Sequence, residues 1–133
     1  MNSDGQLGAP TTETCTVGSI VSPCSTTPVM VSGGLTFATV SPGTYHTCGV
    51  TTDGVGYCWG GNGTGELGDG TTDGHPSPVR ISGGLIFVSV SAGNLHTCGA
   101  TTSGAAYCWG SNDYGQLGDG TTTSSRVPTR VGQ

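Results

Sequence analysis

The stretch HTCGVTTDGVGYCWG, residues 46–60, decides the fold because it returns at residues 96–110 as HTCGATTSGAAYCWG. Around it, residues 32–72 and 82–122 align without a gap and are identical at 27 of 41 positions. The two copies are offset by 50 residues, a period typical of proteins that stack equivalent structural units. We therefore interpret the chain as a tandem repeat.

A third, incomplete copy opens the chain. NSDGQLG at residues 2–8 matches NDYGQLG of the last copy, and PVMVSGGL at residues 28–35 matches PVRISGGL of the middle copy. Between these landmarks the first copy is ten residues longer than the middle one, and the additional segment contains Cys15 and Cys24.

The composition favours strands and excludes several classes of partner. Glycine accounts for 26 of 133 residues, 8% of residues are charged, and lysine is absent. Abundant glycine and threonine disfavour helices and suit short strands joined by tight turns, so we predict an all-β fold. The net charge of -5 argues against nucleic acid, whose phosphates are bound by clustered lysine and arginine. No apolar run is long enough to predict insertion into a membrane.

Each complete copy divides into four short strands. In the middle copy they are expected at residues 35–41, 46–50, 55–60 and 78–81, with an Asp-Gly turn closing the central hairpin. Four antiparallel strands in a 50-residue unit are the content of one β-propeller blade.

The predicted organisation is two complete blades and part of a third. Residues 1–31 form a partial blade, with an outer strand at Val29–Val31 and the cysteine-bearing insertion, and residues 32–81 and 82–133 form one blade each. Two isolated blades leave apolar faces without a neighbour, which repeat proteins avoid by adding repeats or caps. We therefore expect a piece of a longer propeller, or a protomer that self-associates into a closed propeller, with its last blade docked on the first blade of the next copy.

The six cysteines form a regular pattern. Cys48 and Cys58 each lie five residues from Asp53, the centre of the hairpin turn, so they face each other across two strands at a separation that a disulfide bridges. Repeat symmetry and local spacing thus predict three disulfides: Cys15–Cys24, Cys48–Cys58 and Cys98–Cys108. Disulfides are typical of oxidising compartments, so we expect an extracellular, periplasmic or cell-surface protein. Polar residues follow Met1 in place of a signal peptide, and we expect a processed or truncated start.

An alternative interpretation makes His46, Cys48 and Cys58 a metal site that recurs in the next copy. A structural zinc takes four ligands, and no clear fourth donor accompanies either set. The histidines are then expected to be structural, with imidazoles hydrogen-bonded to backbone groups. Trp59 and Trp109 directly follow a cysteine, so they point to the opposite face, where we expect them to pack against the next blade.

Residues 84–122, GLIFVSVSAGNLHTCGATTSGAAYCWGSNDYGQLGDGTT, resemble the repeat of the regulator of chromosome condensation family in its bacterial secreted or surface form. The motifs HTC, YCWG, N..GQLG and GDGTT carry the resemblance, which covers nearly the whole chain except the insertion with Cys15 and Cys24. It implies a propeller of about seven four-stranded blades, of which only two are complete here. The family includes a nuclear nucleotide exchange factor that binds chromatin, ubiquitin-ligase subunits and a bacterial β-lactamase inhibitor, which share protein binding through loops on one face.

No motif for catalysis or for a cofactor is present. The chain has no recognisable serine, histidine and acid arrangement and no phosphate-binding loop. Asp69 and Asp119 in LGDGTT offer one certain carboxylate per copy, too few for calcium, and an Asp-Gly step is typical of a turn. NGT at Asn62 matches the N-glycosylation pattern, and we interpret it as a loop signal. We therefore expect a protein that is not an enzyme and has no cofactor or metal.

The two complete copies differ where loops are expected, at positions 44–45 against 94–95 and 63–64 against 113–114. A constant scaffold with variable loops is a common way to build a binding surface, and neutral drift on exposed loops predicts the same pattern. The predicted function is a scaffold that binds another protein through five loop residues: Tyr45, Asn94, Leu95, Asp113 and Tyr114.

Two other functions stay open. The resemblance implies a guanine-nucleotide exchange factor as one alternative, although disulfides fit poorly with a cytosolic GTPase partner. The other is a carbohydrate-binding propeller, in which Tyr45 and Tyr114 would serve as aromatic platforms.

Overall fold

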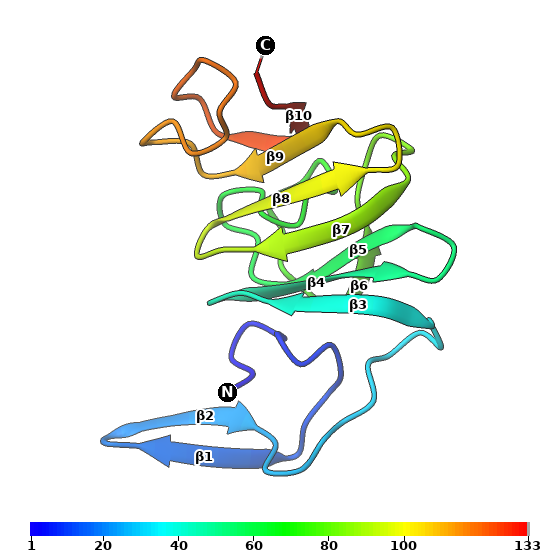
Figure 1. The fold of residues 1–133 in the computed structure, drawn as a ribbon. Coiled ribbons are helices and arrows are strands. Elements are labelled where there is room, and N and C mark those ends of the chain that lie inside the picture. Colours follow the sequence, from blue (N-terminus) through cyan, green and yellow to red (C-terminus); the bar gives the residue numbers. More distant parts are fainter. Residues whose placement is uncertain (133) are drawn as a thin grey trace.

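The computed structural model describes residues 1–132, which contain ten β-strands and no helix (Figure 1). No helix capable of crossing a membrane therefore occurs in this range. The strands are β1 (Glu13–Val17), β2 (Ile20–Cys24), β3 (Phe37–Pro42), β4 (His46–Thr51), β5 (Gly56–Gly60), β6 (His75–Arg80), β7 (Phe87–Ala92), β8 (His96–Thr101), β9 (Ala106–Gly110) and β10 (Ser125–Arg130).

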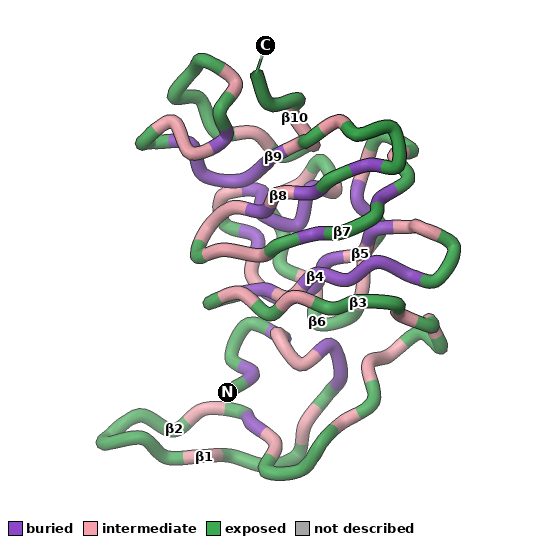
Figure 2. The backbone as a smooth tube through the Cα atoms, in the orientation of Figure 1, coloured by how far each residue is buried: buried purple, intermediate pink, exposed green. Residues whose placement is uncertain are grey.

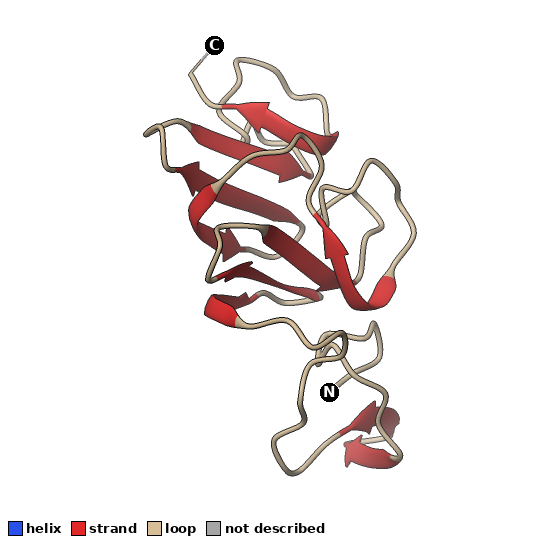
Figure 3. Cartoon of the chain, turned by 90° about the vertical axis from the view of Figure 1, so that its right-hand side faces the viewer, coloured by secondary structure: helices blue, strands red, loops and turns tan. Residues whose placement is uncertain are grey.

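The strands form two equivalent sheets and one separate hairpin. Strands β3 to β6 make one four-stranded antiparallel sheet and β7 to β10 make the second, with neighbours in chain order in both. The two sheets lie one above the other (Figures 1 and 3). The all-β fold and the four strands per repeat are therefore as predicted from the sequence.

The central hairpin of each sheet places its cysteines opposite each other. Cys48 pairs with Cys58 across β4 and β5, and Cys98 pairs with Cys108 across β8 and β9. Their Cα atoms are 4.0 and 4.1 Å apart, and both pairs form disulfides. All three predicted disulfides are present: Cys15–Cys24, Cys48–Cys58 and Cys98–Cys108. The metal-site interpretation is therefore wrong, because its cysteines are bonded to each other.

The core lies between the two sheets. Buried positions concentrate in β4, β5, β8 and β9, whereas β1 and β2 are largely exposed (Figure 2). Phe87 and Val90 of β7 both lie in the buried cluster. They are three residues apart, so strict alternation would place them on opposite faces, but the register of β7 against β8 shifts between Phe87 and Ser89 and brings both to the buried side. The buried cluster consists of Cys48, Val50, Cys58, Leu67, Ile81, Phe87, Val90 and Trp109.

The outer strand expected at Val29–Val31 does not form. The equivalent residues 79–81 and 129–131 lie largely within β6 and β10, which are strands because they pair with β5 and β9. Within residues 1–132 no strand lies beside Val29–Val31, so its backbone has no ladder partner. The insertion instead folds as the hairpin β1–β2, which projects away from the sheets (Figures 1 and 3).

Successive units are joined by the same hydrogen bonds. The indole Nε1–H of Trp59 donates to the main-chain oxygen of Gln6 at 2.9 Å. In the next unit, Trp109 Nε1–H donates to the main-chain oxygen of Glu66 at 2.9 Å, and the Thr97 hydroxyl donates to the same oxygen at 2.7 Å. We call this set of contacts the seam.

The seam also corrects the expected direction of tryptophan packing. Trp59 and Trp109 pack against the preceding unit, not the next one, and both are buried within the single chain. A glycine permits the close approach: Gly68 has φ +72°, and a Cβ added there would lie 2.5 Å from Trp109 Nε1. The alternation along a strand distinguishes its two faces, but the stacking direction of the blades decides which neighbour each face meets.

Candidate functional site

The loops that differ between the repeats gather at one end of the two sheets. His46 lies opposite Gly60, so the loop before β4 and the loop after β5 share an end, and the same register repeats in the second sheet. The two sheets meet there, because Thr44 N–H donates to the main-chain oxygen of Gly93 at 3.2 Å. We call this region the loop end; it comprises residues 43–45, 61–74, 93–95 and 111–124.

A groove of about 740 Å³ opens at the loop end, between the first sheet and the N-terminal segment. Tyr45 and Leu95 form part of its wall, together with residues 2–5 of the N-terminal segment. Gly61–Gly63 and Glu66 contribute from the loop after β5. Tyr45 is 45% exposed, so its ring combines a packed face with a surface that a ligand can reach.

Three of the five predicted contact residues lie outside the groove lining. Asn94 and Asp113 are exposed, and Tyr114 is 93% exposed. They share the loop end with Tyr45 and Leu95 but do not line the groove with them. The structure thus brings together two predicted residues and leaves the other three on the surrounding surface.

Asn62 holds the loop after β5 from within. Its Nδ2 donates to the main-chain oxygens of Thr71 at 3.1 Å and Asp73 at 2.9 Å, and its Oδ1 accepts the Leu67 N–H at 2.9 Å. Asn112 makes the corresponding bonds in the next repeat. Because Asn62 is only 2% exposed, its NGT pattern marks a loop anchor and not an accessible glycosylation site in the folded protein.

The aspartates of LGDGTT serve the same loops. Asp69 Oδ1 accepts the Thr71 N–H at 3.0 Å, and Asp69 Oδ2 lies 3.3 Å from Nε2 of His75. The pKa of Asp119 is lowered, mainly because its carboxylate accepts the backbone N–H of Thr121. Among residues 1–132 no three His, Cys, Asp or Glu side chains are grouped to hold a metal ion.

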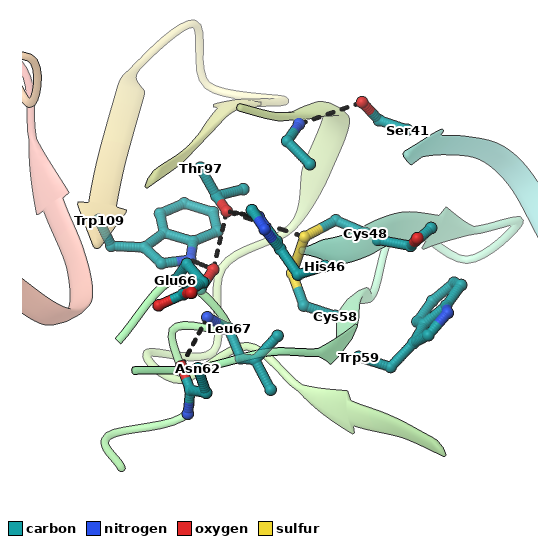
Figure 4. The surroundings of a disulfide bond; sticks show 12 residues. Ser41, His46, Cys48, Cys58, Trp59, Asn62, Glu66, Leu67, Thr97 and Trp109 are labelled. Atoms are coloured by element: carbon teal, nitrogen blue, oxygen red, sulfur yellow. Dashed lines mark hydrogen bonds between the residues drawn. A yellow bond between two sulfur atoms is a disulfide. The ribbon is translucent and has the colours of Figure 1, made fainter. Parts of the chain in front are cut away.

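His46 is buried where the two sheets meet (Figure 4). The Thr97 hydroxyl gives its proton to the oxygen of Glu66, so it accepts Nε2–H of His46 at 2.7 Å. Nδ1 of His46 is then an acceptor and has no partner within residues 1–132. Burial lowers the pKa of His46 from 6.5 to about 4; Glu66 raises it and His96 lowers it further. The histidine is structural, with a side-chain hydroxyl as partner where we expected backbone groups.

Glu66 is a groove residue that sequence reasoning missed. It is 1% exposed, and its Oε2 accepts the N–H of Thr64 at 2.8 Å and the Thr64 hydroxyl at 2.7 Å. The other repeats have Gln6 and Gln116 at this position. This replacement of an amide by a carboxylate in one repeat is the sequence signal that could have identified Glu66 as a candidate site residue.

Comparisons with known proteins agree on the family and the fold. The model for the regulator of chromosome condensation (RCC1) repeat matches residues 53–100 and 103–133, and a second model of this repeat matches residues 87–116. No curated protein sequence matches the chain at a significant level.

Similar solved structures include Prp20p from Saccharomyces cerevisiae, with 22% identity, a TM-score of 0.78, and coverage of 100% of this chain and 33% of that one. Yeast RCC1 (Prp20) bound to Kap60 gives 22% identity, a TM-score of 0.77, and coverage of 100% and 32%. Human WBSCR16 gives 24% identity, a TM-score of 0.77, and coverage of 98% and 33%. These matches establish the fold as part of a β-propeller, and the chain spans about a third of the length of each. The chain belongs to the regulator of chromosome condensation (RCC1) repeat family.

Proposed function

We propose that the chain is a non-enzymatic scaffold that binds a protein partner through its loop end, with the groove beside Tyr45 and Leu95 at the centre of the contact. The groove is the observation that carries this proposal. Binding energy at interfaces concentrates in partly enclosed pockets, and tyrosine is among the residues that most often provide it. Asn94, Asp113 and Tyr114 form the surrounding rim, where individual contacts contribute less.

Structural relatives support a role in protein binding. Prp20p was described with binding to Gsp1p and histones, and yeast RCC1 (Prp20) was solved bound to Kap60. The likeness extends to the fold and not to these partners, so the partner of this chain is proposed only as a protein. Three disulfides favour an extracellular, periplasmic or cell-surface location, which disfavours an exchange factor for a cytosolic GTPase.

The seam contacts disfavour self-association into a head-to-tail ring. In a head-to-tail ring, Trp59 of one copy would dock on the last repeat of another, but Gln6 and Gly8 of its own chain already cover it. The last repeat retains the docking geometry: Gly118 has φ +66°, and the nearest atom to a Cβ there is Cγ1 of Val131 at 3.2 Å. We therefore propose that a further repeat, and not a second intact copy, docks beside Gly118.

Affinity capture tests the binding function. Immobilised chain is exposed to secreted and cell-surface extracts, and any captured protein is purified and titrated against Tyr45→Ala and Tyr114→Ala. We expect Tyr45→Ala to weaken binding by roughly tenfold or more, because a pocket anchor contributes more than a rim residue. Tyr114→Ala is the matched control and should change affinity only a few-fold at most. A glycan array run in parallel decides the alternative: glycan binding without protein capture would make the chain a carbohydrate-binding propeller.

A further inference from the structure

We propose that the groove receives the guanidinium group of an arginine from the partner, held by Glu66 with Asp4 and Tyr45 beside it. This inference rests on the proposed protein-binding function and specifies the chemistry of the partner. Three observations support it: one oxygen of the buried Glu66 carboxylate has no hydrogen-bond donor, the other repeats have an amide at this position, and the charged residues of the groove are acidic.

The Glu66 carboxylate is buried without a cation. Its Oε2 accepts the N–H of Thr64 and shares the Thr64 hydroxyl proton with the main-chain oxygen of Leu95, whereas Oε1 receives no hydrogen bond within residues 1–132. Within residues 1–132 no lysine, arginine or histidine nitrogen lies within salt-bridge distance of Glu66, because the contact of this kind in that range joins His75 and Asp69. A carboxylate removed from water is costly unless donors or a cation replace its hydration. Because Glu66 lines the groove, a donor entering from outside can supply that replacement.

The other repeats show what is missing at this position. Gln6 uses both ends of its amide: Oε1 accepts Asp4 N–H at 3.0 Å, and Nε2 donates to Asp4 Oδ2 at 3.0 Å. Gln116 does the same, accepting Tyr114 N–H at 2.9 Å and donating to Ser111 Oγ at 3.4 Å. Like the glutamines, Glu66 accepts a backbone N–H through one side-chain oxygen. Its second oxygen, however, is an acceptor, whereas the Nε2 amide of each glutamine is a donor. The repeat geometry therefore leaves one place in the groove for an external N–H donor.

The groove has the charge and shape for a basic side chain. Its charged lining residues are Asp4 and Glu66, both acidic, and none of the three arginines lines it. Asp4 and Tyr45 both lie close to Gly61: a Cβ added there would be 3.7 Å from Asp4 Cβ and 3.3 Å from Tyr45 Cβ. The side chains of Tyr45 and Asp4 thus start from the same part of the groove.

A guanidinium fits this combination better than an ammonium. It is planar, carries five N–H donors, stacks on aromatic faces and is less strongly hydrated than the lysine head group. Hydrogen bonds between ionised partners are about twice as strong as neutral ones. A neutral side chain of the same shape would lack the charge that Glu66 requires.

Titration of the isotopically labelled 133-residue chain with the blocked tripeptide Gly-Arg-Gly tests the inference by NMR. We expect saturable shifts of the Gly61, Gly63 and Thr64 amides. Gly-citrulline-Gly, which keeps the shape and loses the charge, should bind about tenfold more weakly or worse, and Gly-Lys-Gly should bind several-fold more weakly.

Two variants locate the charge effect. Glu66→Gln introduces the residue that both other repeats tolerate, so the fold should persist, and it should weaken Gly-Arg-Gly binding about tenfold. Asp113→Asn removes one negative charge from the loop end outside the groove and should change binding less than about twofold.

Equal binding of the arginine and citrulline peptides, or equal binding to the wild type and Glu66→Gln, would overturn the inference. Its failure is distinguishable from failure of the proposed function. A captured protein that depends on Tyr45 but not on Glu66 would leave the scaffold function standing and remove only the arginine.

Discussion

Trp109 Nε1 and the main-chain oxygen of Glu66 are 2.9 Å apart, and this hydrogen bond joins the second sheet to the loop of the first. Trp59 and Gln6 repeat the relationship one unit earlier, also at 2.9 Å. Glu66 therefore has two separable roles: its main chain holds the next blade, and its side chain lines the groove. Binding and stability at this residue can be perturbed independently.

Replacing Trp109 by Phe should destabilise the protein by about 2 kcal/mol, from the lost hydrogen bond and the reduced packing volume. Urea unfolding measures the change in the free energy of unfolding. Tyr114→Phe is the control, because Tyr114 is exposed and its hydroxyl has no bond in the seam. A loss below about 0.5 kcal/mol for Trp109→Phe would contradict the stabilising role of the seam.

Gly68→Ala and Gly118→Ala form a matched pair. Both glycines have positive φ, +72° and +66°, so alanine imposes a similar backbone strain of about 1 kcal/mol at each. Only at Gly68 does the new Cβ also meet Trp109, at 2.5 Å from Nε1. We expect Gly68→Ala to cost roughly 2 kcal/mol more than Gly118→Ala by urea unfolding. Equal costs would show that the seam accommodates the methyl group.

Stability should fall as the pH drops from 6.5 toward 4. In the folded protein the pKa of His46 is lowered to about 4 from 6.5, mainly by burial, so between these values the unfolded chain binds a proton that the folded chain does not. Linkage then makes the loss about 3 kcal/mol across this window, with full stability above it.

Urea unfolding at several pH values measures this dependence, with His46→Gln as the test variant and His75→Gln as the control. His46→Gln should flatten the slope between pH 6.5 and 4, whereas His75→Gln should retain it, because His75 is more exposed. An unchanged slope in His46→Gln would assign the acid sensitivity to carboxylates.

The disulfides should differ in their contribution to stability. Replacing Cys48 and Cys58 together by alanine removes a buried link in the core and should cost about 2 to 3 kcal/mol. The same change at Cys15 and Cys24 affects a hairpin outside that core and should leave the main unfolding transition almost unchanged. Thermal unfolding of the two double variants separates these outcomes, and equal losses would mean that β1–β2 folds cooperatively with the sheets.

Much of the fold was predictable because the two copies of the repeat can be aligned with each other, which shows the spacing that both share. Cys48 and Cys58 are equally spaced from the hairpin turn, and this spacing predicts the pairing that the structure shows. The direction of Trp59 was not predictable, since strand alternation does not specify which neighbour a face meets. Val29–Val31 has strand-like residues, but a strand also needs a paired neighbour, which its sequence cannot reveal.

The candidate site was predictable only in part. Variable positions led to Tyr45 and Leu95, because loops at one end of a sheet converge. They led equally to Tyr114, which differs between the repeats yet lies outside the groove lining. Glu66 was missed because a Glu-for-Gln change looks conservative until the hydrogen bonds of the three copies are compared.

Binding of a protein through the loop end is tested by a hydrogen-exchange footprint of the chain with its captured protein partner bound. We expect slowed amide exchange at residues 43–45, 61–66 and 93–95, where the groove opens at the loop end. The hairpin turns at residues 52–55 and 102–105, at the opposite end of the sheets, should exchange as they do in the free chain. Protection confined to those turns, or to β1–β2, would contradict binding through the loop end.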